Sequence, residues 1–304
     1  MKPFKTYSQA SSFLNNELPF YQLQGKTAFK PGLDNIKALC DHLDNPQDKI
    51  KTIHIAGTNG KGSTAHILAS VLQEHGIKTG IHTSPHLLEL KERLKIDGET
   101  CSSDFIIEFL NKTASIIERI KPSFFEVTVA MAFDHFAENE TDIAIIETGL
   151  GGRLDATNII TPLIAAITNI GLEHQDFLGD SLEKIAYEKA GIMKQNVPAI
   201  IGENNPETRE VFEKMAELRD SPLYFANSTN SDNETDLKGS YQRQNHDLTI
   251  KILDVLSKDL KLPLLKNFND KKLKEGLKNV VKNTNIRGRW EIINNSPLTI
   301  CDIA

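Results

Sequence analysis

The sequence predicts an α/β fold: a mostly parallel sheet of the phosphate-loop type, with helices on both of its faces. Short apolar runs recur along the chain, helix-like patterns separate them, and a glycine-rich segment joins the first such run to the first such helix. Strands that alternate with helices pair in parallel, and the helices then cover both faces of the sheet.

The first strand and helix have the clearest pattern. KTIHIA (51–56) is a short run rich in β-branched residues, which is typical of a buried strand. STAHILASVLQEHG (63–76) has its apolar residues at helical spacing and ends at Gly76, a residue that commonly terminates helices.

The remaining elements follow by the same criteria. Strands are expected at 78–82, 141–147, 162–170 and 197–202, and helices at 103–120, 126–138 and 180–191. In the last helix, Asp180 is expected at the N-cap with Glu183 three residues later and Gly191 at the end. The polar segment 225–242 is expected to be a surface loop or a short edge hairpin.

Composition excludes several function classes. The chain has 304 residues, with 35 basic and 41 acidic side chains and a net charge of −6. This mild acidity argues against a nucleic-acid partner, which needs a basic face. No apolar stretch is long enough to span a membrane, and the first residues lack the apolar core of a signal peptide. The three cysteines fit neither a disulfide framework nor a zinc pattern, so we expect plain thiols in a reducing cytoplasm.

The segment HIAGTNGKGSTAHIL (54–68) predicts a phosphate site. Its glycines lie between a strand and a helix, where backbone N–H groups can face an anion. A glycine turn alone would not explain Lys61, whose charge opposes the helix dipole at that position. The generic phosphate-loop pattern is matched only in part, because Ile55 and Gly62 stand where it has Gly and Ser or Thr.

Three more polar residues follow predicted strands. Ser84, Glu147 and His174 come directly after strand ends, and ligands of parallel α/β sheets gather at that edge. These side chains and Lys61 would suit a metal-bound nucleotide. Taken singly, each also fits a solvated loop residue.

Lys189 lies on the apolar stripe of the helix 180–191. A buried amine is costly unless it is paired or modified. Its place near the helix C-terminus allows a second interpretation, because cations suit that end and lysine side chains can reach solvent from an apolar face. The pattern alone leaves both interpretations open.

Seven ordered motifs carry a resemblance to a known family. GTNGKGS, TSPHL, FFEVTVAMAF, ETGLGGRLDATN, GLEHQDFLG, EKAGIMK and GRWE together resemble the folylpolyglutamate synthase/dihydrofolate synthase family, relatives of the Mur ligases. The resemblance runs from about residue 15 to the last residue. It implies a sheet like that of the Mur ligase central domain, with GTNGKGS as the family's own form of the phosphate loop.

The resemblance implies an ATP-dependent ligase. It would phosphorylate a carboxylate of dihydropteroate or folate with ATP and Mg²⁺, and L-glutamate would then attack the acyl phosphate. Family members are commonly monomers. The implied ATP-loop residues are Gly57, Thr58, Asn59, Gly60, Lys61, Gly62 and Ser63. The implied metal ligands are Ser63, Ser84, Glu147 and His174, with Lys61, His174 and a carbamylated Lys189 as the catalytic group.

Further site residues are implied by position in the motifs. The implied substrate residues are Ser84, Pro85, His86, Phe124, Glu126, Thr128, Arg153 and Asp155. The implied nucleotide residues outside the loop are Gln242, Asn245, Arg289 and Asp302. Tyr241 departs from the family, which commonly has His there, and core packing remains an alternative for Phe124. The other histidines, His66 among them, are expected to be structural, with His86 undecided between the two roles.

The resemblance also implies a domain division. Residues 1–296 would form the ATP-binding domain, and 297–304 would begin a smaller C-terminal α/β domain that is absent from this sequence. Such a chain is expected to bind ATP weakly and to form no product alone. Two other functions stay open: a nucleotide-binding module without ligase activity, and a Mur-type cell-wall ligase. The sequence does not decide between dihydropteroate and folate as acceptor.

Overall fold

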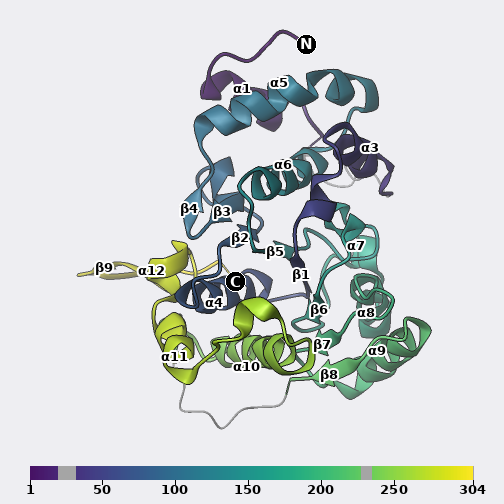
Figure 1. Ribbon diagram of the computed structural model, residues 1–304, viewed down its shortest axis with the longest axis vertical. Helices are drawn as coiled ribbons and strands as arrows, with labels where there is room; N and C mark the ends of the chain where they lie inside the picture. The colour runs from purple at the N-terminus through teal and green to yellow at the C-terminus, as the bar shows by residue number, and fades with distance from the viewer. Residues whose placement is uncertain (20–31, 227–234, 304) are drawn as a thin grey trace.

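The computed structural model describes residues 1–19, 32–226 and 235–303 and is built on an eight-stranded sheet (Figure 1). The strand order is β4-β3-β2-β5-β1-β6-β7-β8. Six strands pair in parallel: β1 (Thr52–Ala56), β2 (Thr79–His82), β5 (Ile143–Glu147), β6 (Ile164–Ile167), β7 (Ala199–Ile201) and, at the edge, β8 (Leu223–Phe225). A hairpin of β3 (Leu94–Ile96) and β4 (Glu99–Thr100) adds antiparallel to β2.

Helices cover both faces of the sheet, as predicted (Figure 1). One face carries α1 (Tyr7–Asn16), α3 (Asp34–His42), α5 (Ser103–Ile120), α6 (Phe124–Glu138), α8 (Leu182–Ala190) and α9 (Pro206–Leu218). The other carries α4 (Lys61–Glu74), α10 (Gln242–Asp254), α11 (Asp270–Lys278) and α12 (Val280–Thr284). Short helical turns are η2 (Pro46–Lys49), η3 (Leu90–Arg93), η4 (Ala156–Ile159), α7 (Gln175–Leu178), η5 (Val255–Asp259) and η6 (Pro263–Leu265).

The parallel strands other than β8 are buried on both faces because each face packs on helices, whereas the edge strand β8 is half-buried. Ile53 and Ile55 of β1 point into the core formed with α4 and α10, whereas Ala56 points toward α8. Every residue of β1 and β5 is buried. This two-sided burial explains why the strands read as continuous apolar runs rather than alternating ones.

Serine residues begin three of the helices. The Ser102 hydroxyl accepts the N–H of Phe105 in α5, and Ser123 forms a capping box with Glu126 in α6. In α8 the cap is Ser181, so the prediction of Asp180 as N-cap is wrong by one residue. Asp180 instead pairs with Lys184, with 2.7 Å between Oδ1 and Nζ. Both residue types cap well, and only the backbone course selects one.

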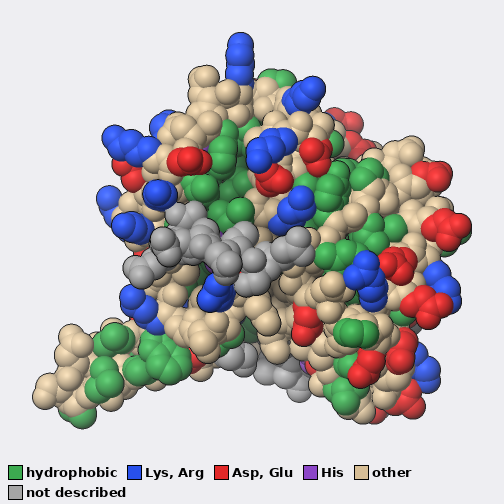
Figure 2. Space-filling view, turned by 90° about the horizontal axis from the view of Figure 1, so that it is seen from below, with side chains coloured by type: hydrophobic (Ala, Val, Ile, Leu, Met, Phe, Trp, Pro, Cys, Tyr) green, Lys and Arg blue, Asp and Glu red, His purple; other side chains and the backbone are tan. Residues whose placement is uncertain are grey.

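A second, two-stranded sheet lies at the end of the chain. The strands β9 (Glu291–Asn295) and β10 (Leu298–Cys301) form an antiparallel hairpin. It projects from the body at the lower left of Figure 2, where hydrophobic side chains gather on it. Ile293 is 59% exposed. The domain boundary expected after residue 296 falls in the turn of this hairpin.

The predicted strands and helices are confirmed, and the majority of their ends are shifted by no more than two residues. The segment 225–242 contains the last residue of β8 and the first of α10, and residues 227–234 lie outside the described residues. No helix of the described chain is long and apolar enough to cross a membrane.

Candidate active site

The glycine-rich loop connects β1 to α4 and is packed against the rest of the sheet edge. Gly57 (φ +146°) and Gly60 (φ +81°) both adopt backbone angles that favour glycine. A Cβ on Gly57 would lie 1.8 Å from Thr168 Oγ1, and one on Gly60 would lie 2.0 Å from Asn245 Oδ1. Thr168 also donates to the carbonyl of Asn59 over 2.6 Å. The loop is therefore held in one shape by Thr168, directly after β6, and by Asn245 of α10.

Lys61 begins α4 and its side chain folds back over the loop. Its Nζ donates to the carbonyls of Gly57 and Thr58, each over 2.8 Å. These are bonds to neutral groups, so the positive charge is not cancelled by a carboxylate there. An anion at the N-terminus of α4 would gain both from this charge and from the helix N–H groups.

Gln242 and Asn245 of α10 pack against the glycine-rich loop, although almost two hundred residues separate them from it in the sequence. Gln242 Nε2 donates to Ser63 Oγ over 3.3 Å, and Asn245 Nδ2 donates to Gln242 Oε1 over 2.9 Å. All three side chains are buried. The structure thus brings these two implied nucleotide residues to the loop.

Glu147 ends β5 next to the loop. It is 3% exposed, and its Oε2 accepts the backbone N–H of Ser84 over 3.0 Å. Its Oε2 also lies 3.6 Å from the position of a Cβ on Gly62, so the missing side chain lets it face α4. Burial raises the pKa of Glu147, and the Lys61 charge opposes this. A buried carboxylate beside a cationic loop fits Mg²⁺, which takes only one or two protein carboxylates.

His174 lies after β6, on the segment that leads into α7. It is exposed, it has φ +44°, and it lies at the N-cap of the short helix α7. Across the described ranges no three His, Cys, Asp or Glu residues form a cluster that could hold a metal ion. Glu147 and Ser84 are therefore the predicted metal residues that the structure places side by side.

Lys189 is buried and paired, not exposed to solvent. It is 1% exposed, and its Nζ lies 2.9 Å from the carbonyl of Gly57 and 2.6 Å from Glu173 Oε1. Burial lowers its pKa to about 8, Lys61 acts in the same direction, and Glu173 acts against both. The interpretation of Lys189 as a lysine that reaches solvent is excluded by this burial, and its amine touches the phosphate loop.

Four contributors to the site were not predicted from the sequence. Arg93 is 2% exposed, its Nε donates to His86 Nδ1 over 2.7 Å, and burial lowers its pKa to about 10. Its Nη2 has no hydrogen-bond partner in the described part of the chain. The other contributors are Thr168, Asn169, whose Oδ1 accepts the N–H of Asn59, and Glu173. A polar residue directly after an apolar strand was a usable indication for Thr168 and Asn169.

The segment FFEVT forms the start of α6 and is mostly buried. Phe124 is fully buried with Arg93 over its ring at 5.1 Å, and Phe125 packs against Gly149. Glu126 accepts the N–H of Ser123 in the capping box, and the Thr128 hydroxyl donates to the carbonyl of Phe125. These contacts stabilise the helix start. The substrate roles of Phe124, Glu126 and Thr128 stay predictions.

Asp155 and Arg153 order the loop after β5. Asp155 is buried, and its Oδ2 accepts the N–H groups of Gly149 and Leu150. Arg153 forms a two-pronged ion pair with Glu188 of α8. Their implied contacts with substrate also stay predictions.

Arg289 and Asp302 lie at the end of the described chain near the loop. Arg289 Nη1 donates to the carbonyls of Gly288 and Ile303, and its Nη2 lies 3.6 Å from the position of a Cβ on Gly62. Asp302 accepts the hydroxyl of Tyr241 over 2.8 Å. The tyrosine that departs from the family pattern therefore fixes an implied nucleotide residue.

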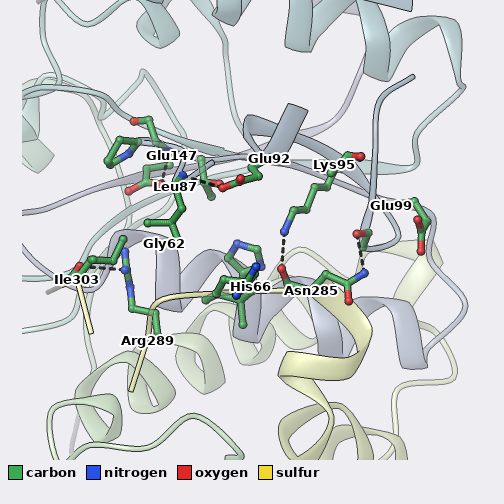
Figure 3. A pocket seen from close by; sticks show the side chains of 17 residues that line it. Gly62, His66, Leu87, Glu92, Lys95, Glu99, Glu147, Asn285, Arg289 and Ile303 are labelled. Carbon is green, nitrogen blue, oxygen red and sulfur yellow. Dashed lines mark hydrogen bonds between the residues drawn. The ribbon is translucent and has the colours of Figure 1, made fainter. Parts of the chain in front are cut away.

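A cavity of about 350 Å³ opens beside these groups. Gly62, Ser84, Pro85, Glu147 and Arg289 line one end of it (Figure 3). Its volume is within the range of small-molecule sites, about 300–1,000 Å³. The site can thus hold an anion at the loop, a divalent ion at Glu147 and a further small molecule next to both.

Comparisons with known proteins show the family of this chain. Residues 55–270 match the model of the Mur ligase middle domain. The chain is 33% identical to the dihydrofolate synthase/folylpolyglutamate synthase of Bacillus subtilis, over 98% of this chain and 73% of the relative. Among solved structures, it is similar to folylpolyglutamate synthase from Thermotoga maritima, with a TM-score of 0.79 and 35% identity over 91% of this chain and 68% of that one. It is also similar to Escherichia coli FolC in complex with DHPP and ADP, with a TM-score of 0.83 and 27% identity over 100% of this chain and 72% of that one.

Proposed function

We propose a function for this chain, which belongs to the folylpolyglutamate synthase/dihydrofolate synthase family and contains its Mur ligase middle domain. The chain is part of an ATP-dependent ligase that adds L-glutamate to dihydropteroate or to the γ-carboxylate of a folate. The observation that carries the proposal is the group of Lys61, Glu147 and the backbone of Ser84 at one sheet edge.

The chemistry requires an activated carboxylate. An oxygen of the acceptor carboxylate attacks the γ-phosphorus of ATP, the bond between that phosphorus and the β,γ-bridging oxygen breaks, and ADP leaves. The neutral amine of L-glutamate then attacks the acyl carbon and the amide bond forms. The bond between the acyl carbon and the phosphate oxygen breaks, and inorganic phosphate leaves with that oxygen and takes up the proton that the nitrogen loses. Phosphoryl transfer of this kind depends mainly on positioning and charge neutralisation.

Each residue of the site has a role suited to this reaction. The N–H groups of residues 57–63 would hold the phosphates, and Lys61 would exchange its two carbonyl contacts for phosphate oxygens. Ser63, Ser84 and Glu147 would hold Mg²⁺, with His174 as a fourth residue, and the ion would neutralise phosphate charge when bound. Arg289 adds a second cation beside Gly62.

We further propose that Lys189 is carbamylated. A neutral amine attacks CO₂, an N–C bond forms, and one proton passes to water. The lowered pKa of Lys189 supplies the neutral amine near physiological pH. Lys61, which repels the ammonium form, would attract the carbamate anion, and a carbamate could then serve as a metal ligand.

Carbamylation of Lys189 is expected to increase as the pH rises from 7 to 9, because its pKa of about 8 makes the neutral amine the main form above that value. The measurement is the ¹³C NMR spectrum of the chain in ¹³C-bicarbonate. Lys189→Met should remove the carbamate resonance. Lys184→Met is the matched control, since Lys184 lies on the same helix but is exposed, and its ion pair with Asp180 raises its pKa. A wild-type spectrum without the resonance would contradict the proposal.

Two alternatives remain within this proposal. A Mur-type cell-wall ligase would use the same activation on another acceptor, and a nucleotide-binding module would bind ATP without ligation. The folate branch is supported by the relatives, whose names are those of dihydrofolate and folylpolyglutamate synthases. We place the reaction in the cytoplasm, because the three cysteines are free and two of them are buried.

The testing experiment uses a protein that also carries the implied C-terminal domain. It measures ADP release with Mg-ATP and one of three acceptors: dihydropteroate, tetrahydrofolate or a UDP-muramyl substrate, each with and without L-glutamate. Release that requires a pterin acceptor, together with a glutamyl product, would support the proposal. Release with the UDP-muramyl substrate alone would overturn the folate assignment. ATP binding without any acceptor-dependent release would favour the binding module.

A further inference from the structure

The loop 83–89 joins the proposed metal carboxylate to the end of the described chain. Near its start, the N–H of Ser84 donates to Glu147 Oε2 over 3.0 Å. Farther along, Leu87 Cδ1 lies 3.0 Å from the position that a Cβ on Gly288 would take. The course of this loop therefore decides whether Ser84 meets Glu147 at the sheet edge.

Glu92 of η3 holds the second half of this loop. Its Oε2 accepts the N–H of Leu87 over 2.7 Å (Figure 3). Its Oε1 accepts the N–H groups of Leu88 and Glu89, each over 2.8 Å. Burial raises the pKa of Glu92, but these three N–H groups and His86 outweigh it, and the pKa lies below its usual value. The side chain is therefore an ionised carboxylate at neutral pH, and its bonds to the loop are charge-assisted.

Arg93, the next residue of η3, holds the first half of the loop. Its carbonyl accepts the N–H of Thr83 over 3.2 Å, and its Nε donates to His86 Nδ1 over 2.7 Å. The Arg93 side chain is 2% exposed and lies over the ring of Phe124, so it is fixed from the core side. The short turn η3 thus holds the loop on both sides of Ser84.

Helix capping explains only part of what Glu92 does. Glu89 and Glu92 form a capping box, which accounts for the bond between Glu92 and the N–H of Glu89. Leu87 and Leu88 come before the first residue of the turn, so the bonds from their N–H groups add nothing to its cap. Those two bonds fix the loop instead.

We propose that Glu92 is a positioning residue of the ligase, which fixes the loop 83–89 so that Ser84 stays on Glu147 and faces the metal that both would hold. The inference rests on the proposed function, because that function assigns Ser84 and Glu147 to Mg²⁺. Glu92 acts through the loop, since all its printed bonds are to loop backbone within the described residues. Groups that orient metal ligands in this way commonly change metal affinity or activity 10- to about 100-fold when they are removed.

The first measurement is the hydrogen exchange of the backbone amides in the 304-residue chain, followed by NMR. Glu92→Ala is expected to speed the exchange of the N–H groups of residues 87–89 about tenfold, because each loses a hydrogen bond to a charged group. Glu92→Gln keeps one acceptor oxygen and should have a smaller effect. Glu99→Ala is the matched control, since Glu99 is an exposed carboxylate at the rim of the same cavity. Unchanged exchange in Glu92→Ala would overturn the inference.

The second measurement is the Mg²⁺ dependence of ADP release by a protein that also carries the implied C-terminal domain. Glu92→Ala is expected to raise the Mg²⁺ concentration for half-maximal release about tenfold, whereas Glu99→Ala should leave it unchanged. Thermal melting checks the fold, and Glu92→Gln carries both measurements if Glu92→Ala unfolds.

The outcomes separate this inference from the proposed function. A lowered melting temperature in Glu92→Ala with an unshifted Mg²⁺ midpoint would reduce Glu92 to a structural role and overturn the inference alone. Wild-type release that does not depend on Mg²⁺ would overturn the metal assignment of the proposed function, and the inference with it. A shifted midpoint together with faster exchange at residues 87–89 would support both.

Discussion

In a protein that also carries the implied C-terminal domain, replacing Lys61 with alanine is expected to slow ATP turnover about a thousandfold without unfolding the protein. The side chain now bonds only two loop carbonyls, so its loss removes no buried ion pair from the described structure. Its charge would act on the phosphates in the transition state, and a thousandfold effect corresponds to ~4 kcal/mol. The measurement is ADP release under saturating ATP and acceptor, with thermal melting of the same preparation.

Lys214→Ala serves as the control for this variant, because Lys214 is an exposed lysine in an ion pair with Glu210 on α9. It should release ADP at the wild-type rate. Wild-type turnover in Lys61→Ala would show that the loop 57–63 does not hold the transferred phosphate.

Glu147→Gln is expected to reduce turnover about a hundredfold and to weaken the response to Mg²⁺. A carboxylate is a better ligand for this ion than a neutral amide, and few other protein ligands are available to replace it. The free energy of unfolding of Glu147→Gln, by contrast, should not fall and is expected to rise. Burial raises the pKa of Glu147, so the charged form costs folding free energy at neutral pH, and the neutral amide removes that cost.

The sign of this linkage can be checked directly. A raised folded-state pKa means that wild-type Glu147 opposes folding above its unfolded pKa, and that this effect is relieved as the pH falls. The melting temperature of Glu147→Gln should therefore equal or exceed that of wild type at pH 7. Glu183→Gln, an exposed carboxylate of α8, is the control. An unchanged midpoint for Mg²⁺ in Glu147→Gln would remove this residue from the metal site.

The fold was predictable because its determinants are local. The apolar runs of β1 and β5 and the helical spacing of α4 are present in the sequence itself, and parallel pairing follows from their alternation. The same rule placed Ser84 and Glu147 at one sheet edge, and the hydrogen bond between them confirms that placement. The error at Asp180 arose where two adjacent residues can both cap a helix.

The remaining parts of the site depend on contacts between distant segments. Asn245 against Gly60 and Lys189 against Glu173 are products of the tertiary fold. Arg93 and His66 gave no indication of their surroundings in the sequence. His66, expected to be structural, lines the cavity because α4 turns that face toward β3. The pattern of apolar residues in the sequence does not indicate which buried polar atom lacks a hydrogen-bond partner.

A crystal structure of the chain grown with Mg²⁺, a non-hydrolysable ATP analogue and a folate acceptor tests most directly whether this sheet edge is the ATP site of a ligase. The triphosphate is expected along residues 57–63, with Lys61 on its oxygens, Mg²⁺ at Glu147 and the acceptor carboxylate next to the γ-phosphate. A triphosphate bound elsewhere, with Lys61 still on the carbonyls of Gly57 and Thr58, would contradict this assignment.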